Sequence, residues 1–546
     1  MKIALAQLNY HINNFDNNVA KIIAHIRRAK EAGAELVVFS ELAVCGYPPH
    51  DLLERREFLE KCEAAIESIA EHTDGIGVIV GAPSVNPSES GKMLFNSAYF
   101  LAEGEVLHVT HKTLLPTYDI FDEYRYFEPN RNFDVVEYRG NQIAITICED
   151  LWDDQPIVNR FGKNRLYRTS PMEHLAKQSP DIVINIAASP FSHDKVEDRL
   201  SVFLGNVRRY KLPVIYVNQV GANTDLIFDG SSMVLSADGE VCASLRSFEE
   251  DFSVVDTDLL EPQQVSPSTT IERIHQALVL GIRDYFKKMG FKAAALGLSG
   301  GIDSAVVLAL AAEALGKDNV RVLMMPSRYS SDHSVSDAVA QADRMGVRYD
   351  IVTIEEGFKA FENMLQPIFD DLPINVAEEN IQARIRGILV MGISNKFGNL
   401  VLNTTNKSEA AVGYGTLYGD MNGSMSILGD VYKTQVYELA RYINTREDII
   451  PENVISKAPS AELRPDQKDT DSLPDYPILD SILFRYIERQ DDAESIVAAG
   501  FDRDIVQKVI RLVNLNEYKR YQFAPVLRVS SKAFGYGRKM PLVFKF

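Results

Sequence analysis

The sequence predicts an α/β protein made of two units, and three observations support this prediction. At 546 residues the chain is too long for one hydrophobic core. Short apolar runs alternate with polar-faced helical stretches through both halves. Between the halves, residues 256–270 are first acidic and then rich in turn-forming residues, as in a linker. We therefore expect one domain at residues 1–265 and a second at residues 266–546.

The first unit contains short apolar runs of strand length, separated by stretches with a polar face. The predicted strands are residues 2–8, 35–42, 75–84, 97–102, 142–150, 181–189 and 212–221. The predicted helices are residues 17–33 and 199–211.

The second unit begins with a Ser/Thr cluster that is suited to cap a helix over residues 271–290. The predicted strands that follow are residues 293–301, 320–327, 348–354 and 400–406. Predicted helices lie between and after them, at residues 336–346, 381–398 and 431–445. This alternation is typical of a mainly parallel sheet with helices packed on it.

Composition narrows the class of protein. With 46% hydrophobic and 24% charged residues, the chain is typical of soluble globular proteins, and it has no apolar run of about 20 residues to span a bilayer. The N-terminus becomes polar too early for a secretory signal. Four scattered cysteines fit neither a disulfide framework nor a zinc ribbon, so we expect a cytoplasmic protein.

The formal net charge of −19 argues against binding to nucleic acid or to anionic membranes, which requires a basic surface. A phosphate-bearing ligand would have to be held by local donors, because the overall field repels anions.

Three strand ends in the first unit carry reactive side chains. Cys148 ends the apolar run QIAITIC, Glu41 ends another, and Lys112 lies beside a third strand end. A lone cysteine at a strand end is more often a core residue, but here a base and a cation accompany it. A thiol needs such partners to become a nucleophilic thiolate, and the cation can also stabilise an oxyanion. The motifs contain no histidine, which disfavours a Cys-His protease.

With Glu41 followed by GYPP and Cys148 followed by Glu-Asp, residues 1–260 resemble the carbon-nitrogen hydrolase (nitrilase) superfamily. The resemblance implies an αββα sandwich that cleaves amides or nitriles through a covalent thioester or thioimidate. It makes Glu41, Lys112 and Cys148 the catalytic triad. In glutamine-using relatives, the residues that match Tyr118, Ser189 and Lys195 hold the amino-acid end of the substrate, and Glu123 resembles a second glutamate near the lysine. Each of these four could also be a solvated loop residue.

The string SGGIDS, residues 299–304, follows a predicted strand and opens a helix. Paired glycines let the backbone approach a phosphate, and the helix N-terminus offers free N–H groups and a partial positive charge. The string lacks the lysine of the Walker loop. Because Asp303 would repel a phosphate, we expect a divalent cation such as Mg²⁺ between them.

SGGIDS resembles the pyrophosphate loop of the N-type ATP pyrophosphatases, which implies a doubly wound parallel sheet of the adenine nucleotide alpha hydrolase type. Further motifs resemble the NAD⁺ synthetase family over residues 270–546; they are residues 325–334, 379–387, 403–409, 413–420, 429–440 and 530–538. With the amidase half attached, the whole chain resembles the glutamine-dependent members of that family.

The resemblance implies site residues by motif. Those expected to bind ATP are Gly297, Leu298, Ser299, Gly300, Gly301, Ile302, Asp303, Ser304, Arg328, Thr404 and Lys433. Those expected to bind the dinucleotide deamido-NAD⁺ are Asn380, Arg384, Glu409, Asp420 and Lys532. Asp303 and Glu409 are the expected Mg²⁺ ligands. A basic residue in such loops could equally be a surface charge.

The implied reaction is the ATP-dependent amidation of deamido-NAD⁺ with ammonia released from glutamine, and the implied partners are small molecules only. Members of this family pair through the C-terminal domain, so a homodimer or larger homo-oligomer is expected. Two alternatives stay open. Another pyrophosphate-loop enzyme would not need deamido-NAD⁺ in the assay. A tRNA-modifying or tRNA-binding protein on the same fold would retain tRNA in a filter-binding assay, although the net charge and the complete triad disfavour it.

Overall fold

The computed structural model describes residues 1–154, 166–370, 372–465 and 467–545. The chain divides into two compact units, Met1–Pro267 and Ser268–Phe546. None of the helices in the described residues combines the length and the apolar character needed to cross a membrane.

The first unit contains two six-stranded sheets. One runs in the order β14 (Asp251–Asp256), β1 (Lys2–Gln7), β2 (Leu36–Val38), β3 (Gly77–Val85), β4 (Leu94–Ala102) and β5 (Glu105–His111). The other runs β13 (Val241–Ser244), β12 (Met233–Leu235), β9 (Val214–Asn218), β8 (Ile182–Ala187), β7 (Asn141–Ile147) and β6 (Val136–Tyr138). A separate hairpin joins β10 (Val220–Asn223) to β11 (Leu226–Asp229).

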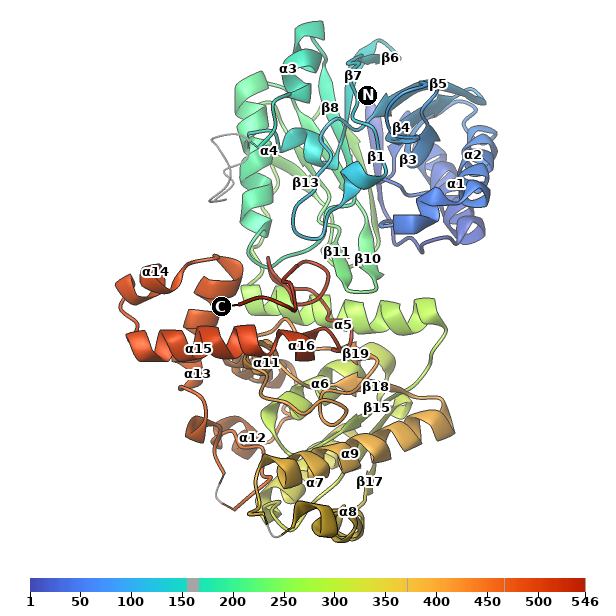
Figure 1. The fold of residues 1–546 in the computed structure, drawn as a ribbon. Helices are drawn as coiled ribbons and strands as arrows, with labels where there is room; N and C mark the ends of the chain where they lie inside the picture. The colour runs from blue at the N-terminus through green and yellow to red at the C-terminus, as the bar shows by residue number, and fades with distance from the viewer. Residues whose placement is uncertain (155–165, 371, 466, 546) are drawn as a thin grey trace. The chain divides into compact units, whose positions relative to one another are not determined.

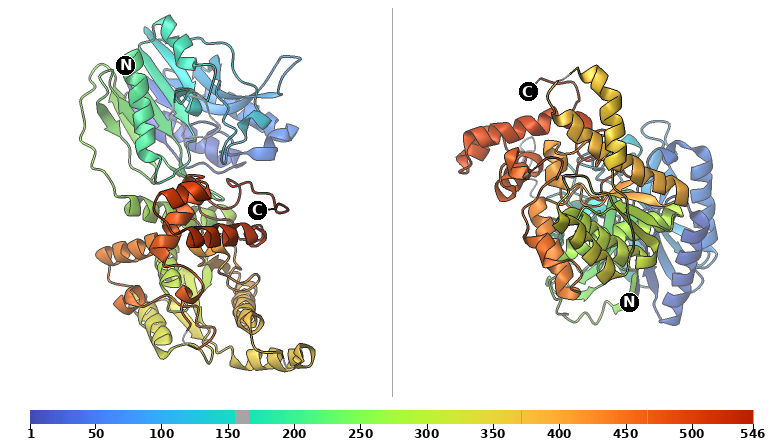
Figure 2. Two further views of the ribbon diagram at one scale, coloured as in Figure 1. Left: turned by 60° about the vertical axis from the view of Figure 1, so that its left-hand side comes forward. Right: turned by 90° about the horizontal axis from the view of Figure 1, so that it is seen from below.

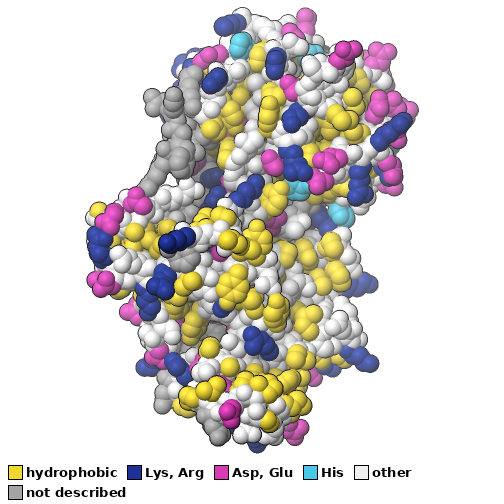
Figure 3. All heavy atoms as spheres, viewed as in Figure 1, with side chains coloured by type: hydrophobic (Ala, Val, Ile, Leu, Met, Phe, Trp, Pro, Cys, Tyr) yellow, Lys and Arg dark blue, Asp and Glu magenta, His cyan; other side chains and the backbone are white. Residues whose placement is uncertain are grey.

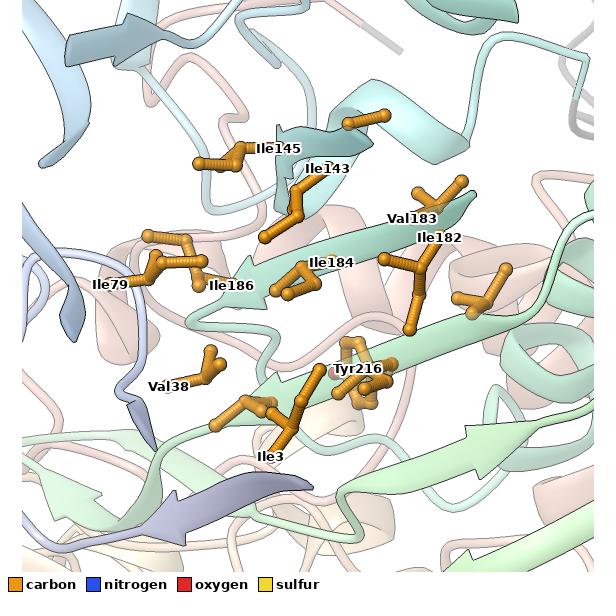
Figure 4. Packing of buried hydrophobic residues seen from close by; sticks show 14 of the residues in the cluster. Ile3, Val38, Ile79, Ile143, Ile145, Ile182, Val183, Ile184, Ile186 and Tyr216 are labelled. Carbon is orange, nitrogen blue, oxygen red and sulfur yellow. The ribbon is translucent and has the colours of Figure 1, made fainter. Parts of the chain in front are cut away.

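The two sheets stack through apolar side chains that alternate along their strands. Ile3, Val38 and Ile79 of the first sheet share one buried cluster with the isoleucines of β7 and β8 (Figure 4). On the other face of the first sheet, Ala4 and Val37 pack with α1 (Phe15–Glu31) and α2 (Arg56–Ala70).

The second sheet carries α3 (Pro171–Leu175) and α4 (Val196–Tyr210), so helices lie outside both sheets (Figures 1 and 2). This arrangement is the predicted αββα sandwich.

The second unit has one five-stranded parallel sheet in the order β17 (Arg348–Ile351), β16 (Val320–Met324), β15 (Ala294–Gly297), β18 (Leu400–Asn403) and β19 (Met425–Ser426). From β15 the chain first builds toward β17 and then returns to place β18 on the other side of β15. The predicted doubly wound sheet is thus confirmed. In such sheets ligands bind at the carboxyl ends of the strands, where the winding reverses, which is here between β15 and β18.

The sheet of the second unit is accompanied by twelve described helices (Figure 1). These are α5 (Thr270–Met289), α6 (Ile302–Leu315), α7 (Asp332–Met345), α8 (Glu355–Phe369), α9 (Val376–Phe397), α10 (Lys407–Val412), α11 (Lys433–Arg446), α12 (Glu452–Ser456), α13 (Tyr476–Leu483), α14 (Ala493–Ala498), α15 (Arg503–Leu515) and α16 (Glu517–Arg520). As expected from the Ser/Thr cluster, α5 is capped: the Thr269 side chain accepts from the Glu272 N–H at 3.3 Å.

Several elements differ from those predicted. The strand expected at residues 35–42 covers only Leu36–Val38, so Glu41 lies in the buried turn that follows. The strand expected at residues 142–150 ends at Ile147, because Cys148 has a φ of +44° that no strand continues. Strand β5 and helices α2 and α8 had not been predicted.

Candidate active sites

A buried network of charges occupies the first unit. The Lys112 ammonium, which comes directly after β5, donates to Glu41 Oε1 at 2.7 Å and to Glu123 Oε1 at 2.9 Å. All three side chains are almost fully shielded from solvent. Burying charges is tolerated only when they are paired and hydrogen-bonded, as they are here.

The glutamates of this network are fixed by neighbouring donors. Asn96 Nδ2 in β4 donates to Glu41 Oε1 at 2.7 Å, and the Ala188 N–H, just after β8, donates to Glu41 Oε2 at 2.8 Å. The Tyr47 hydroxyl donates to Glu123 Oε1 at 3.0 Å. Both sheets therefore contribute to holding Glu41 in place.

Cys148 begins the 3₁₀ turn Cys148–Leu151 at the end of β7. Asp150 holds this turn, since its Oδ2 accepts from the Ile147 N–H at 3.0 Å and its Oδ1 accepts from the Thr113 and Leu114 N–H groups, each at 2.9 Å. The aspartate thereby ties the cysteine turn to the segment that carries Lys112. The left-handed φ of Cys148 is a strained backbone state of the kind found at functional sites.

The electrostatics of the site keep the thiol protonated and the lysine charged. Burial and the Glu41 carboxylate raise the pKa of the Cys148 thiol well above its usual value, although Lys112 acts in the other direction. Burial alone would lower the pKa of Lys112, but Glu123, Glu41 and Cys148 raise it well above its usual value. A thiolate therefore requires that a base take the proton during the reaction.

Further polar residues converge beside the cysteine. The hydroxyls of Tyr118 and Tyr167 each donate to Glu149 Oε1 at 2.8 Å, and Lys195 acts electrostatically on the same carboxylate. The backbone of Ser189 exchanges two hydrogen bonds with the Asn218 side chain, at 2.8 and 3.2 Å. This set contains the charged and polar groups that an amino acid's ammonium and carboxylate require.

The second unit places the SGGIDS string at the carboxyl end of β15. Ser299 Oγ lies 3.2 Å from Ser304 Oγ and accepts from the Gly301 N–H at 3.2 Å, so the loop is closed on itself. Gly300 has a φ of +77°, and a Cβ at this position would lie 2.1 Å from the carbonyl oxygen of Ser334. Only glycine fits there.

The acidic residues of the motifs meet beside this loop. Lys433 Nζ lies 2.5 Å from Asp303 Oδ2 and 3.4 Å from Glu409 Oε1. Asn406, which caps α10, donates from Nδ2 to Asp303 Oδ1 at 2.8 Å. Burial and Asp303 raise the pKa of Glu409 to about 8. Residues after β15 and after β18 thus join at the point where the winding reverses.

These groups border a cavity of about 500 Å³. Its lining includes Thr404, Asn380 and Asp420, as well as the loop residues. Asn380 Oδ1 accepts from the Thr416 hydroxyl at 2.7 Å, and Asp420 Oδ1 accepts from the Thr416 N–H at 2.6 Å. The cavity is of the size that binds small molecules.

The donor set fits a hard divalent cation that shares its coordination with a ligand. Across the described ranges, there is no group of three or more His, Cys, Asp and Glu side chains that could hold a metal. Asp303 and Glu409 supply the carboxylate ligands that Mg²⁺ prefers, with phosphate oxygens and water to complete the coordination, and in this structure the Lys433 ammonium is their counter-charge.

The chain matches two family models. Residues 2–265 match carbon-nitrogen hydrolase, and residues 274–523 match NAD synthase. A glutamine-dependent NAD(+) synthetase from Synechocystis is 46% identical, covering 100% of this chain and 99% of that one. Another from Acinetobacter baylyi is 45% identical, covering 99% and 98%. The chain belongs to the glutamine-dependent NAD(+) synthetase family.

A solved structure extends the likeness. The glutamine-dependent NAD⁺ synthetase from Acinetobacter baumannii, determined in complex with ADP, is 41% identical with a TM-score of 0.79, covering 99% of this chain and 98% of that one. The family predicted from the motifs is confirmed. Membership of this NAD(+) synthetase family makes the chain a ligase.

Three residues expected from the synthetase motifs lie away from the cavity lining. Arg328 pairs with Glu355 at 2.5 Å, and the exposed Arg384 donates from Nε to the Leu417 carbonyl at 3.3 Å. Lys532 lies in the C-terminal segment, where its N–H donates to Ser530 Oγ at 3.3 Å. The structure brings the other synthetase motif residues to the loop or to the cavity.

Sequence reasoning missed several residues that shape the two sites. Asn96 and Asn185 are polar residues inside apolar strands, which is a signal that could have been read. Tyr47 and Asp150 belong to the motifs that contain Glu41 and Cys148, but their own roles had no separate indication in the sequence. Asn406 shares its motif with Glu409.

Proposed function

We propose that the chain forms NAD⁺ from deamido-NAD⁺, ATP and glutamine, with the first unit supplying ammonia and the second unit consuming it. The products are NAD⁺, AMP, pyrophosphate and glutamate. The observation that carries the proposal is the presence, in one chain, of a buried Glu41–Lys112 pair beside Cys148 and of a glycine loop beside Asp303 and Glu409.

In the first unit, Cys148 Sγ bonds to the side-chain carbonyl carbon of glutamine as Glu41 takes the thiol proton. Lys112 stabilises the negative charge that develops on the carbonyl oxygen. The carbon–nitrogen bond then breaks, Glu41 returns the proton, and ammonia leaves. Water hydrolyses the thioester and frees glutamate and the thiol. Tyr118, Ser189, Lys195 and Glu149 hold the amino-acid end, while Glu123 fixes Lys112.

In the second unit, the loop Gly297–Ser304 and Lys433 hold the ATP phosphates, and Thr404 contacts ATP from the cavity wall. A Mg²⁺ ion, held by Asp303 and Glu409, would offset phosphate charge. The nicotinate carboxylate bonds to the α-phosphorus and pyrophosphate departs. Ammonia then bonds to the acyl carbon, loses a proton, and displaces AMP. Asn380, Glu409 and Asp420 are the proposed dinucleotide contacts in the cavity.

The division of labour is tested with Cys148→Ala. Without the nucleophile, NAD⁺ synthesis from glutamine should fall by more than about 10³-fold. Synthesis from ammonium chloride should stay near the wild-type rate, because the synthetase unit is untouched. NAD⁺ is measured in both assays. As a control, Asp303→Asn should reduce both rates, and equal loss of both rates in the Cys148 variant would refute the proposal.

We also propose that the chain forms a homodimer through the second unit. The exposed side of α8, the connection after it and the first residue of α9 present large apolar side chains, which are Phe361, Met364, Ile368, Leu372, Ile374 and Val376 (Figure 3). Exposed apolar patches of this kind usually mark interfaces. On α9, Arg384 lies one turn before Ile388, and both side chains are exposed on the same face of the helix. If this face lies at the subunit boundary, a dinucleotide bound at the boundary would contact Arg384. Arg328 stays a proposed contact of ATP and Lys532 a proposed contact of deamido-NAD⁺, because the family resemblance implies both roles.

We further propose a cytoplasmic location. All four cysteines are free thiols, as is usual in a reducing compartment.

A further inference from the structure

Arg386 on α9 is a cationic residue of the synthetase cavity that no motif comparison had singled out. Its side chain lines the cavity and lies close to the end of β16, where Nε donates to the Met325 carbonyl at 3.0 Å. The remaining guanidinium nitrogens are not used by this bond. In the described part of the chain, Arg386 has no ion-pair partner.

A half-buried guanidinium without a paired carboxylate carries a desolvation cost in the free protein. Burial lowers the pKa of Arg386, while Asp420 and Glu462 act on it electrostatically in the other direction. Both carboxylates have other partners: Asp420 accepts from the Thr416 N–H, and Glu462 accepts from the hydroxyls of Ser331 and Ser334. An anionic ligand in the cavity would supply the missing partner.

The position of Arg386 indicates which part of a ligand it meets. Lys433, Asp303 and Glu409 lie on α11, α6 and α10, and they meet beside Asn406, which follows β18. Arg386 reaches the end of β16, which is the strand on the opposite side of β15. The glycine loop at the end of β15 lies between these two strands. Because Lys433, the glycine loop and Arg386 line one cavity, an ATP that lies along the loop with its β- and γ-phosphates at Lys433 has room to place its α-phosphate near Arg386.

We propose that Arg386 binds the α-phosphate of ATP, and of AMP after the reaction, as a second cationic contact separate from Lys433. The inference rests on the proposed function, since it assumes that ATP phosphates occupy the glycine loop. A guanidinium offers a planar fork of donors that matches two oxygens of a phosphate. In this position the guanidinium also stabilises the negative charge that develops on the α-phosphate oxygens when a carboxylate attacks.

Three small probes separate the two cationic contacts. AMP carries only the α-phosphate, pyrophosphate represents the β- and γ-phosphates, and adenosine carries no phosphate. Isothermal titration of the full-length protein should show that wild type binds AMP more tightly than adenosine. In Arg386→Met this preference should fall by about 10- to 100-fold, the usual value of a hydrogen bond to a charged group. Pyrophosphate binding should be unchanged, which also shows that the unit is folded.

Two further variants complete the test. Lys433→Met should weaken pyrophosphate binding and keep the preference for AMP over adenosine. Arg386→Lys retains the charge without the fork and should recover part of the preference. Arg344→Met, a change at an exposed arginine of α7 that pairs with Asp448 at 3.7 Å, should behave as wild type.

The inference is overturned if Arg386→Met binds AMP as wild type does. It is also overturned if the variant loses affinity only for deamido-NAD⁺, because the arginine would then serve the other substrate. If wild type binds neither AMP nor pyrophosphate, the proposed function itself fails.

Discussion

At the scale of single residues, Glu123 is a buried carboxyl whose charge state should affect the stability of the first unit. Burial raises its pKa to about 7, with Lys112 lowering and Glu41 raising the value. The charged and titratable groups that act on it include Lys112, Glu41, Tyr47, Cys148 and Tyr167. The folded state therefore holds a proton on Glu123 more tightly than the unfolded state does.

The pH dependence of stability should report this difference. The protonated Glu123 side chain contributes its full stabilisation of the folded state below the pKa that Glu123 has in the unfolded chain. This contribution is lost as the pH rises through about 7. Wild type should thus lose up to about 3 kcal/mol between pH 4.5 and 8 relative to Glu123→Gln, which cannot titrate. The measurement is the melting temperature of both proteins against pH. Parallel curves would contradict the prediction, because every other titrating group is common to the two proteins.

Side chains in motifs could be predicted from the sequence, whereas their partners could not. The sequence indicated Glu41, Lys112 and Cys148 as reactive types at strand ends. It could not indicate that Asn96 reaches Glu41, since this contact depends on the pairing of β3 with β4 and on sheet stacking. Arg386 was missed for the same reason: only the folded helix shows that it, and not Arg384, lines the cavity.

At the scale of elements, the turn between β15 and α6 depends on the close approach of α7. Gly300→Ala would place a methyl group against the Ser334 carbonyl and strain a φ of +77°. The loop must then shift, and a displacement of about 1 Å can cost 10²-fold in rate. We expect NAD⁺ synthesis to fall by about this factor, with glutaminase activity unchanged, in assays of both reactions.

Gly290→Ala is the matched control for this substitution. Gly290 ends α5 with a φ of +78°, yet nothing lies within 4 Å of a Cβ there. The control shares the backbone strain, about 1 kcal/mol, without the clash. If Gly290→Ala loses as much synthesis as Gly300→Ala, strain and not the contact with Ser334 is responsible.

Elements with strong periodicity or apolar runs were predictable, and those shaped by their surroundings were not. Helix α5 lies where its cap and apolar spacing indicated. Strand β5 is half exposed and reads as a mixed sequence, so it becomes a strand only by pairing with β4. The strand predicted through Cys148 stops early, because Asp150 draws the chain into a turn.

At the scale of the whole molecule, the apolar side chains on α8 and its connection predict assembly. Ile374 is 77% exposed, which is unusual for a large aliphatic side chain unless another surface covers it. Ile374→Glu would bury a charge in the dimer and should convert it to monomer in sedimentation velocity runs. Val85→Glu, at a 65% exposed position of the first unit, should leave the mass unchanged. A monomeric wild type would rule out the dimer.

The α/β class of both units could be predicted from patterns along the chain, but the order of the strands in each sheet is known only from their pairing in the structure. Alternation indicated a parallel sheet in the second unit, and the resemblance supplied the winding. Only the structure shows that the strand order β16, β15, β18 brings Asp303 and Glu409 together. Asn406, in the same motif as Glu409, bonds to Asp303 although 103 residues separate the two along the chain. A short sequence motif cannot indicate a contact between residues so far apart in the chain.

The buried pairing of Lys112 with Glu41 and Glu123 has a consequence for selectivity. In the resting state the sulfur is a neutral thiol and the Lys112 ammonium is already paired with two carboxylates, so we expect the pocket to react slowly with electrophiles and oxidants. Reactivity emerges only when an amide of the correct shape enters and competes for those donors. We therefore expect turnover without substrate and alkylation of Cys148 to be slow.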